Sequence, residues 1–383
     1  GALTITSDSN GSLTAENLTS GSVQTTIYST SDITITGNAT VTAKINGTAQ
    51  AINSNSANGT ITIADHATVT AVNEYSDSTT TGTDSIAILA GSGNDKAHPT
   101  GTIEVKDSAT LTAKGYGKAL ACQTFTVTRY TVKASEDYNA TNPGEYVAES
   151  LATYKYITAT PAVVNYDVWV GNKQVTSANK DNVLGVTNAN GTPTVTYTPD
   201  TNTLTLNGVT ITNTTENTSG IKASNDLTIA LTGKNNTISG TGHAIKMTNG
   251  ALTIIGPGSL EASSDSGQTT VYTKGNVTIN GGAKITATNT SDGNGDVFDL
   301  GNSENKHTLT ITGTGTQVIA QKTVGSAVAI NHISTLTVNG DATLTAQSNG
   351  TAISCDTFTR GVGYTVNVDA TNYDGSGATA SYQ

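Results

Sequence analysis

The sequence is poor in several residue types, and each shortage excludes a class of protein. Its 383 residues include one tryptophan, one methionine, three phenylalanines and two cysteines. The cysteines, Cys122 and Cys355, are too few for a disulfide framework or a cysteine-based metal site. Nothing in the chain approaches the run of about 18 apolar residues that a membrane-spanning helix requires. We therefore expect two separate thiols and no membrane insertion.

Charge is also scarce and unbalanced. Only 12% of the residues are charged, and 29 Asp and Glu outweigh 18 Lys and Arg, which gives a formal charge of −11. Nucleic-acid binding needs Lys and Arg gathered against phosphates, and no basic stripe is visible in the sequence. The low charge, the few sulphur atoms and the abundant Thr, Asn, Ser and Gly resemble bacterial extracellular proteins. We expect a secreted or cell-surface protein without a nucleic-acid partner.

In place of these residues the sequence has a repeat. An 11-residue module close to [LIV]-T-[ILV]-x-x-x-A-T-[LV]-T-A recurs without gaps. The patterned segments begin at Gly1-Ala2-Leu3, with no secretory signal before them, so we expect the chain to be part of a longer surface protein. The gap-free modules are Ile33–Ala43, Ile61–Ala71, Ile103–Ala113, Leu252–Ala262, Val277–Ala287 and Leu336–Ala346.

The module has the pattern of two short strands joined by a tight turn. In Ile33-Thr34-Ile35 apolar residues alternate with Thr, which is the period of a strand. Gly, Asn or Asp then supplies the turn, Ala39–Ala43 alternates again, and a third apolar element such as Ala51-Ile52 follows. Three short strands per repeat of about 25 residues predict a parallel β-helix with coils about 4.8 Å apart. A β-sandwich, the alternative, would give antiparallel hairpins without one motif recurring in register.

This register also predicts the core. The aliphatic residues of the module should face inward, and the threonines between them should face outward. The residues that we expect to face inward are Ile35, Val41, Ile63, Val69, Leu111, Ile279, Ile285 and Leu344.

A longer repeat shows that the array is duplicated. Thr102–Thr126 matches Thr335–Thr359 at a constant offset of 233 residues, and Cys122 corresponds to Cys355. The stretch between the copies contains acidic residues, several tyrosines and Pro161 but no module, which indicates a C-terminal cap and a linker. We therefore predict two domains, residues 1–160 and 161–383.

The second domain begins with segments that have no counterpart in the first. They read as cap strands covering the unpaired end of the array. They contain Trp169, the single tryptophan, which we expect to fill the interior of the cap; a platform for stacking sugar rings is the alternative.

The modules, preceded by YDVWVG at 166–171 and VTYTPDTNTLTLNG at 195–208, resemble secreted or surface β-helix proteins of bacteria. Members of this group have the pectin-lyase-like right-handed solenoid. The resemblance implies an all-β fold of two tandem right-handed parallel β-helix domains, with three short strands per coil and capping segments. It also implies a carbohydrate-binding or adhesin-like role, although a fold alone does not fix a function.

The sequence offers little support for catalysis. Polysaccharide lyases on this fold use acidic residues with calcium and an Arg or Lys base, but Arg129 and Arg360 lie at the ends of the two copies. Outward strand positions of the module are Thr, so no pair of carboxylates is visible there. The five histidines are scattered and lack metal-binding spacing. We therefore lean against an enzyme.

One segment has the spacing of a calcium loop. Asp292, Asn294, Asp296 and Asp299 alternate with glycine and apolar residues, and Ca²⁺ prefers oxygen ligands on a flexible loop. Calcium is the one cofactor that the sequence suggests, and an ordinary solvated turn is the alternative. The first copy has a looser analogue that runs from Asp77 to Asp95.

Two tyrosines are the best ligand-binding candidates. Tyr75 and Tyr116 follow their modules by similar distances, which would place them at one edge of neighbouring coils, where aromatic rings stack on sugars. Ordinary surface tyrosines are the alternative. The sequence therefore suggests a non-catalytic module that binds a polysaccharide or a cell-surface glycan. A polysaccharide-degrading lyase or hydrolase and a structural stalk are the competing functions, and ice binding is disfavoured because the T-x-T pairs are interrupted.

Overall fold

The computed structural model describes residues 1–76, 84–91, 98–213 and 219–361. The protein is all-β, as predicted, with 54% of its residues in strands and 3% in helix. Within these ranges the helical residues form two short 3-10 segments, η1 (Ala148–Thr153) and η2 (Pro199–Thr201). Among the described residues, no helix has the length and apolar character needed to cross a membrane.

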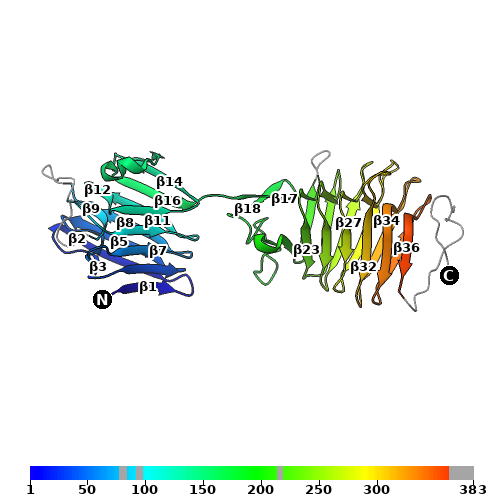
Figure 1. The fold of residues 1–383 in the computed structure, drawn as a ribbon, viewed down its shortest axis with the longest axis horizontal. Helices are drawn as coiled ribbons and strands as arrows, with labels where there is room; N and C mark the ends of the chain where they lie inside the picture. The colour runs from blue at the N-terminus through cyan, green and yellow to red at the C-terminus, as the bar shows by residue number, and fades with distance from the viewer. Residues whose placement is uncertain (77–83, 92–97, 214–218, 362–383) are drawn as a thin grey trace. The chain divides into compact units, whose positions relative to one another are not determined.

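The chain divides into two compact units, Gly1–Ala162 and Val163–Gln383 (Figure 1). Within each unit, strands that recur at the repeat interval lie side by side and run parallel. Several parallel sheets are compatible with a β-helix fold, whereas a β-sandwich would require antiparallel hairpins.

The first unit contains three sets of stacked parallel strands. One sheet consists of β1 (Leu3–Ser7), β4 (Ile33–Gly37), β7 (Thr60–Ile63), β10 (Thr102–Val105) and β13 (Thr124–Val127). The parallel part of the second consists of β2 (Ser12–Ser22), β5 (Thr40–Gly47), β8 (Thr68–Asn73) and β11 (Thr110–Gly115). The third consists of β3 (Ile27–Ser29), β6 (Ile52–Ser54), β9 (Ile86–Ala90) and β12 (Lys118–Ala121).

The registers of these sheets align equivalent positions of the module. Ile33 pairs with Ile61, which pairs with Ile103, so that apolar side chains stack on apolar side chains. All three are fully buried, and the threonines between inward positions are partly exposed. A continuous aliphatic column therefore fills the interior of this unit.

Antiparallel strands cover one end of the first unit. β16 (Tyr156–Pro161) adds to β11 in antiparallel orientation, followed by β14 (Tyr130–Ser135) and β15 (Gly144–Glu145). Tyr154 lies under this cover and is 7% exposed. These strands come from the stretch without modules that the sequence indicated as a cap.

The second unit repeats the scheme with a larger sheet. One half of this sheet contains β17 (Asn165–Val170), β22 (Ile221–Ala223), β25 (Ile245–Met247), β28 (Val271–Thr273) and β31 (Phe298–Leu300), flanked by β18 (Lys173–Thr176). The other half contains β19 (Val195–Thr198), β20 (Thr203–Leu206), β23 (Leu227–Leu231), β26 (Leu252–Ile255), β29 (Val277–Ile279) and β32 (His307–Thr312). The halves are joined by β34 (Ile330–Asn339), which also pairs with β36 (Ile353–Arg360).

A separate six-stranded sheet completes this unit. Its strands are β21 (Thr210–Asn213), β24 (Asn236–Gly240), β27 (Ser259–Ser264), β30 (Lys284–Asn289), β33 (Gln317–Lys322) and β35 (Thr343–Gln347).

The burial of the predicted core residues follows the expected register. Seven of the eight residues predicted to face inward are at most 2% exposed, which confirms the register. Leu344 is only half-buried because, among the residues that the structure describes, β35 is the last strand of its sheet.

Candidate functional site

One row of outward-facing residues in the second unit differs from the threonine rows around it. Six neighbouring strands place one side chain each in register, and the first five of these side chains are flanked on both sides by inward-facing residues. We call this set the central row: Trp169, Lys222, Lys246, Tyr272, Asp299 and Asn331.

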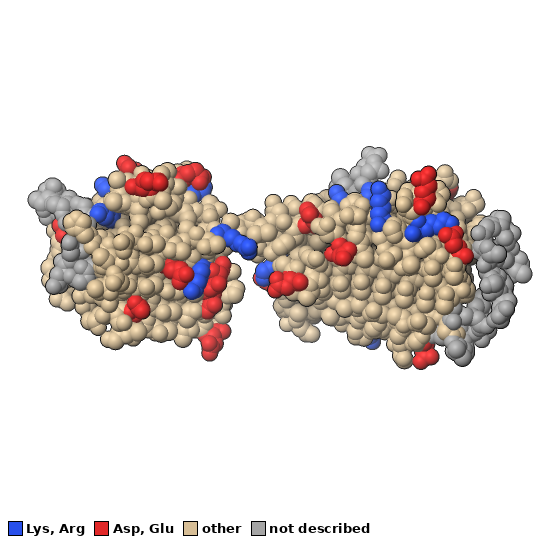
Figure 2. Space-filling view, in the orientation of Figure 1, with Lys and Arg blue, Asp and Glu red and all other residues tan. Residues whose placement is uncertain are grey.

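The other half of the same sheet shows what an ordinary row looks like. There the corresponding register carries only threonine: Thr228, Thr253, Thr278, Thr310 and Thr337. Charged side chains are also sparse over most of the surface visible in Figure 2. A row that gathers aromatic, basic and acidic groups is therefore a departure from the structural repeat, and such departures are expected at functional sites.

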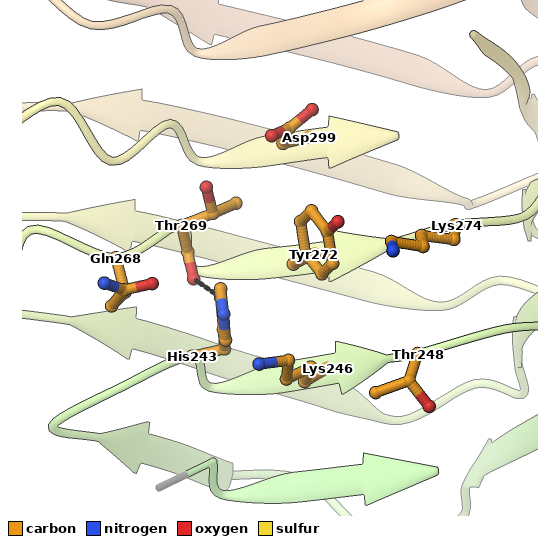
Figure 3. Close-up of a pocket in the computed structure, with 8 residues that line it drawn as sticks. All are labelled: His243, Lys246, Thr248, Gln268, Thr269, Tyr272, Lys274 and Asp299. Carbon is orange, nitrogen blue, oxygen red and sulfur yellow. Dashed lines mark hydrogen bonds between the residues drawn. The ribbon is translucent and has the colours of Figure 1, made fainter. Parts of the chain in front are cut away.

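A groove of about 520 Å³ lies over the middle of the central row. This volume is within the range of small-ligand sites. The groove crosses β25, β28 and β31, so its floor consists of side chains from three parallel strands (Figure 3). The lining residues are His243, Lys246, Thr248, Gln268, Thr269, Tyr272, Lys274 and Asp299.

His243 is the most deeply set of the groove residues. It is 7% exposed, and its Nδ1 lies 2.7 Å from the carbonyl oxygen of Thr269. A carbonyl only accepts hydrogen bonds, so Nδ1 carries the proton and the lone pair belongs to Nε2. Burial lowers the pKa of His243 to about 4, and the nearby charge of Lys246 acts in the same direction. The imidazole is therefore neutral at physiological pH.

The imidazole stacks on the ring of Tyr272. Their centroids are 5.2 Å apart and the rings are inclined by 25°, so the imidazole covers one face of the Tyr272 ring inside the groove. Burial raises the pKa of Tyr272, and the charge of Asp299 adds to the effect. The phenol is therefore protonated and able to donate a hydrogen bond.

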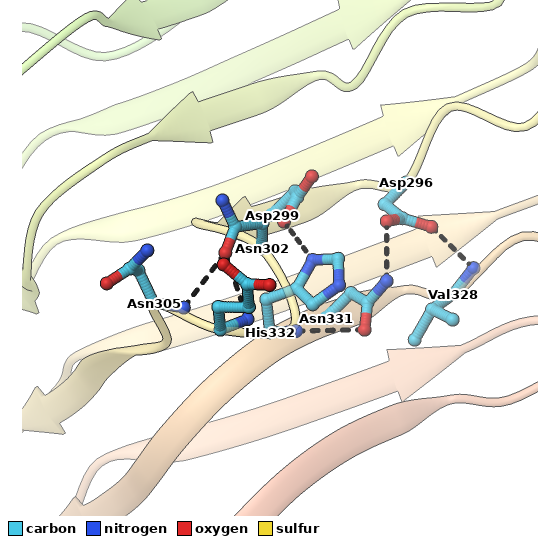
Figure 4. Close-up of polar contacts among 8 residues, drawn as sticks. Asp296, Asp299, Asn302, Asn305, Val328, Asn331 and His332 are labelled. Atoms are coloured by element: carbon cyan, nitrogen blue, oxygen red, sulfur yellow. Dashed lines mark hydrogen bonds and ion pairs between the residues drawn. The ribbon is translucent and has the colours of Figure 1, made fainter.

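Asp299 is held in place by the next strand. His332 Nδ1 lies 2.7 Å from Asp299 Oδ1 (Figure 4). Burial raises the pKa of the Asp299 carboxyl, and His332 opposes this rise through its hydrogen bond and its charge. His332 itself has a φ of 54°, in the left-handed region that few non-glycine residues adopt, and its backbone N–H donates to Asn331 Oδ1.

Trp169 does not fill the cap interior, which corrects the first of the two interpretations of this residue. Its neighbours Val168 and Val170 face inward, with 5% and 0% exposure, and the indole lies on the outer face of β17. The reason is the period of the strand, which places alternate residues on opposite faces. The ammonium of Lys222 lies 5.1 Å from the centre of the indole, in a cation–π contact.

The structure does not bring the four predicted calcium ligands together. Asp292 and Asn294 are exposed, whereas Asp296 is 7% exposed. Both oxygens of Asp296 accept hydrogen bonds, from the backbone N–H of Val328 at 2.7 Å and from Asn331 at 2.9 Å (Figure 4). Asp299 bonds to His332 as described above. Over the described ranges, no group of three or more His, Cys, Asp and Glu side chains is arranged to hold a metal ion.

An internal cation lies beside this loop. Lys322, on the adjacent strand β33, is 2% exposed. Its Nζ donates to Ser291 O at 2.8 Å, Asn289 Oδ1 at 3.0 Å and Gly293 O at 3.2 Å. These oxygens are of the kind that calcium prefers, but here they surround an ammonium group. The sequence could not indicate this contact because Lys322 is about 30 residues away from the loop.

The predicted tyrosines lie at equivalent ends of adjacent strands. Asn73 pairs with Gly115, so Tyr75 and Tyr116 follow β8 and β11 at the same edge. Both are half-buried. However, the ring of Tyr116 stacks on Tyr138 from the cap, with centroids 3.9 Å apart and a 15° inclination, so that one of its faces is covered.

The remaining sequence candidates contribute nothing further to a site. Arg129 is exposed, with a φ of 62°, at the turn between β13 and β14. Asp77 and Asp95, which bound the looser calcium analogue, lie outside the described residues.

Sequence reasoning named Trp169 but missed the rest of the central row, because successive members are 24 to 53 positions apart along the chain. A signal was nevertheless present: the third strands contain Ile-Lys-Ala, Ile-Lys-Met, Val-Tyr-Thr and Phe-Asp-Leu, where the module has Thr at the outward position.

Comparisons with protein-family models, with curated proteins and with solved structures gave no match to this chain.

Proposed function

We propose that this protein is a non-catalytic carbohydrate-binding module whose binding surface is the central row of the second unit. The observation that carries the proposal is the groove over Lys246, Tyr272 and Asp299, with the stacked Tyr272–His243 pair in its floor. An aromatic ring bordered by hydrogen-bonding side chains suits a sugar, which presents apolar C–H groups on its faces and hydroxyls at its rim.

The fold supports this function because it repeats the surface at a fixed interval. We propose that each unit is a right-handed parallel β-helix and that the two units are tandem copies. Adjacent strands lie about 4.8 Å apart, so an extended polymer lying along the stacking direction would meet one member of the central row at each strand. We further propose that the protein acts outside a bacterial cell, attached to a longer surface protein, which agrees with its acidic, threonine-rich composition.

Glycan binding by the full chain tests this proposal. An array of plant, microbial and host glycans identifies a binding partner, and Tyr272→Ala should then weaken its binding about tenfold or more. Tyr28→Ala is the matched control, because Tyr28 is 49% exposed on β3 in the first unit, away from the central row.

The competing functions give different results in the same experiment. A structural stalk would bind no glycan, with or without the substitution. A polysaccharide-degrading enzyme would release new reducing or unsaturated ends from the bound polymer. If Tyr272→Ala and Tyr28→Ala bind equally well, the binding surface is elsewhere and the proposal is wrong.

A further inference from the structure

Three lysines lie on or directly after neighbouring strands of the central row, and two of them line its groove. Lys222 and Lys246 are register partners on β22 and β25, and Lys274 follows β28, the next strand. Lys246 and Lys274 both line the groove beside the ring of Tyr272 (Figure 3). Among the ion pairs of the described residues, none involves any of these three lysines.

This arrangement is unfavourable for the protein alone. Like charges directly opposite each other on neighbouring strands repel, and here the strands are only about 4.8 Å apart. The threonine row in the other half of the sheet shows that the fold does not require charge at such positions. The repulsion is also unusual in a chain whose formal charge is −11, where carboxylates to pair with lysine are plentiful.

The opposite end of the groove has the opposite charge. Asp299 lies beyond Tyr272 in the same register, 15% exposed, with His332 bonded to its carboxylate. The groove therefore has basic side chains on β25 and directly after β28, with Lys222 of β22 next to it in the row, and an acidic side chain on β31. Between them, the neutral imidazole of His243 and the ring of Tyr272 form an uncharged floor.

We infer that the ligand of this groove is an anionic glycan, whose sulfate or carboxylate groups bind Lys246 and Lys274 in the groove and Lys222 beside it. The inference rests on the proposed carbohydrate-binding function and adds the chemical class of the ligand. Each anionic group relieves the lysine repulsion, and the uncharged part of a sugar lies on the His243–Tyr272 floor. Asp299, whose Oδ1 is bonded to His332, accepts hydrogen bonds from hydroxyl groups at the far end, so the charged and neutral parts of the ligand have defined places.

The experiment measures binding of the full chain to three polymers: a sulfated galactan, a polyuronate and a neutral glucan of similar length. We expect the anionic polymers to bind at least about tenfold more tightly than the neutral one at about 0.1 M salt, and to lose this advantage near 1 M salt. Comparison of the sulfated polymer with the polyuronate shows which anionic group is recognised. A single-stranded polynucleotide serves as a phosphate-bearing polymer of another class.

The variants are designed to leave the fold unchanged. Lys222→Gln/Lys246→Gln should reduce binding of the anionic polymers about tenfold, whereas Lys246→Arg should retain it. Lys284→Gln is the control, because Lys284 is exposed on β30 of the separate six-stranded sheet. Melting curves that match the wild type confirm that each variant is folded.

The outcomes separate the inference from the proposed function. If the neutral glucan binds as tightly as the anionic polymers and the double variant is unaffected, the inference is overturned while carbohydrate binding stands. If no polymer binds, both fail. If the polynucleotide binds in preference to every glycan, the basic cluster serves a different class of ligand and both are overturned.

Discussion

Replacement of Lys322 by methionine tests how the loop at 291–296 is held. Lys322 contributes a fully buried ammonium whose three N–H groups meet four oxygens, including Ser291 Oγ at 3.3 Å. Methionine has a similar length and volume but no donor. The substitution therefore leaves the hydrocarbon packing nearly intact and removes only the polar contacts.

The magnitude follows from two opposing effects. The lost bonds have a charged donor, and bonds of that kind contribute about 1.5–3 kcal/mol each, while every oxygen left buried without a donor costs about 1–3 kcal/mol. Ser291, which supplies two of the oxygens, is 6% exposed. The substitution also removes a buried charge, and this offsets part of the lost stability, because burial disfavours the ammonium and lowers the pKa of Lys322. We expect a net loss of roughly 2–4 kcal/mol.

Urea unfolding monitored by circular dichroism measures this loss as a lower midpoint at an unchanged slope. Lys284→Met, an exposed lysine on the adjacent strand β30, should shift the midpoint by well under 1 kcal/mol. Because the loop oxygens already surround an ammonium, we also expect the wild-type melting temperature to be equal in chelator and in millimolar calcium. Equal midpoints for Lys322→Met and wild type, or a calcium-dependent rise in the melting temperature of wild type, would refute the reasoning.

Three other perturbations follow from burial. His243 has a folded-state pKa of about 4, so only the unfolded chain gains its proton between about pH 6.5 and pH 4, and stability falls as the pH falls. Between about pH 7 and about pH 5, protonation of this residue in the unfolded chain should lower the free energy of unfolding by about 2 kcal/mol. His243→Asn keeps a donor for the Thr269 carbonyl and should remove this part of the pH dependence, measured by urea titrations at each pH. Ile63→Ala should destabilise the first unit by roughly 2–5 kcal/mol, because Ile63 is fully buried, and Thr62→Ser by well under 1 kcal/mol; similar losses for both would contradict the register. Burial raises the pKa of Cys122 to about 12 and also raises that of Cys355, so neither free thiol should react with a disulfide reagent near pH 8 until the chain is unfolded; rapid labelling of the folded protein would show that the thiols are accessible.

The strand pattern was predictable because it depends on local chemistry. Alternation of Ile, Val and Leu with Thr fixes which face of a strand is apolar, whatever lies next to it in space. This is why Ile33, Ile61 and Ile103 were predictable as core residues and are found paired with one another. The prediction weakens for Leu344, because burial at the end of a stack depends on whether another strand follows.

The calcium loop stays a prediction, and the structure shows side-chain partners in it that local spacing does not reveal. Asp292, Asn294, Asp296 and Asp299 have a suitable spacing, but β31 begins at Phe298 and turns Asp299 toward His332. Asp296 is engaged by Val328 and Asn331. A spacing argument treats the loop as free to curl around an ion, whereas in the structure Asp296 and Asp299 are each bonded to residues of other segments.

The sequence by itself determined the all-β class, the parallel stacking interval and the identity of the core, since each depends on periodicity within a few residues. Only the tertiary structure decided which outward residues meet. Lys222, Lys246, Tyr272 and Asp299 belong to different repeats, separated by 24 to 27 positions, and become neighbours because each repeat advances the chain by one strand spacing. Inward positions are predictable because every repeat must bury them, so each repeat shows the same apolar pattern. The chemistry of the outward row depends instead on which residues of different repeats the strand register places side by side.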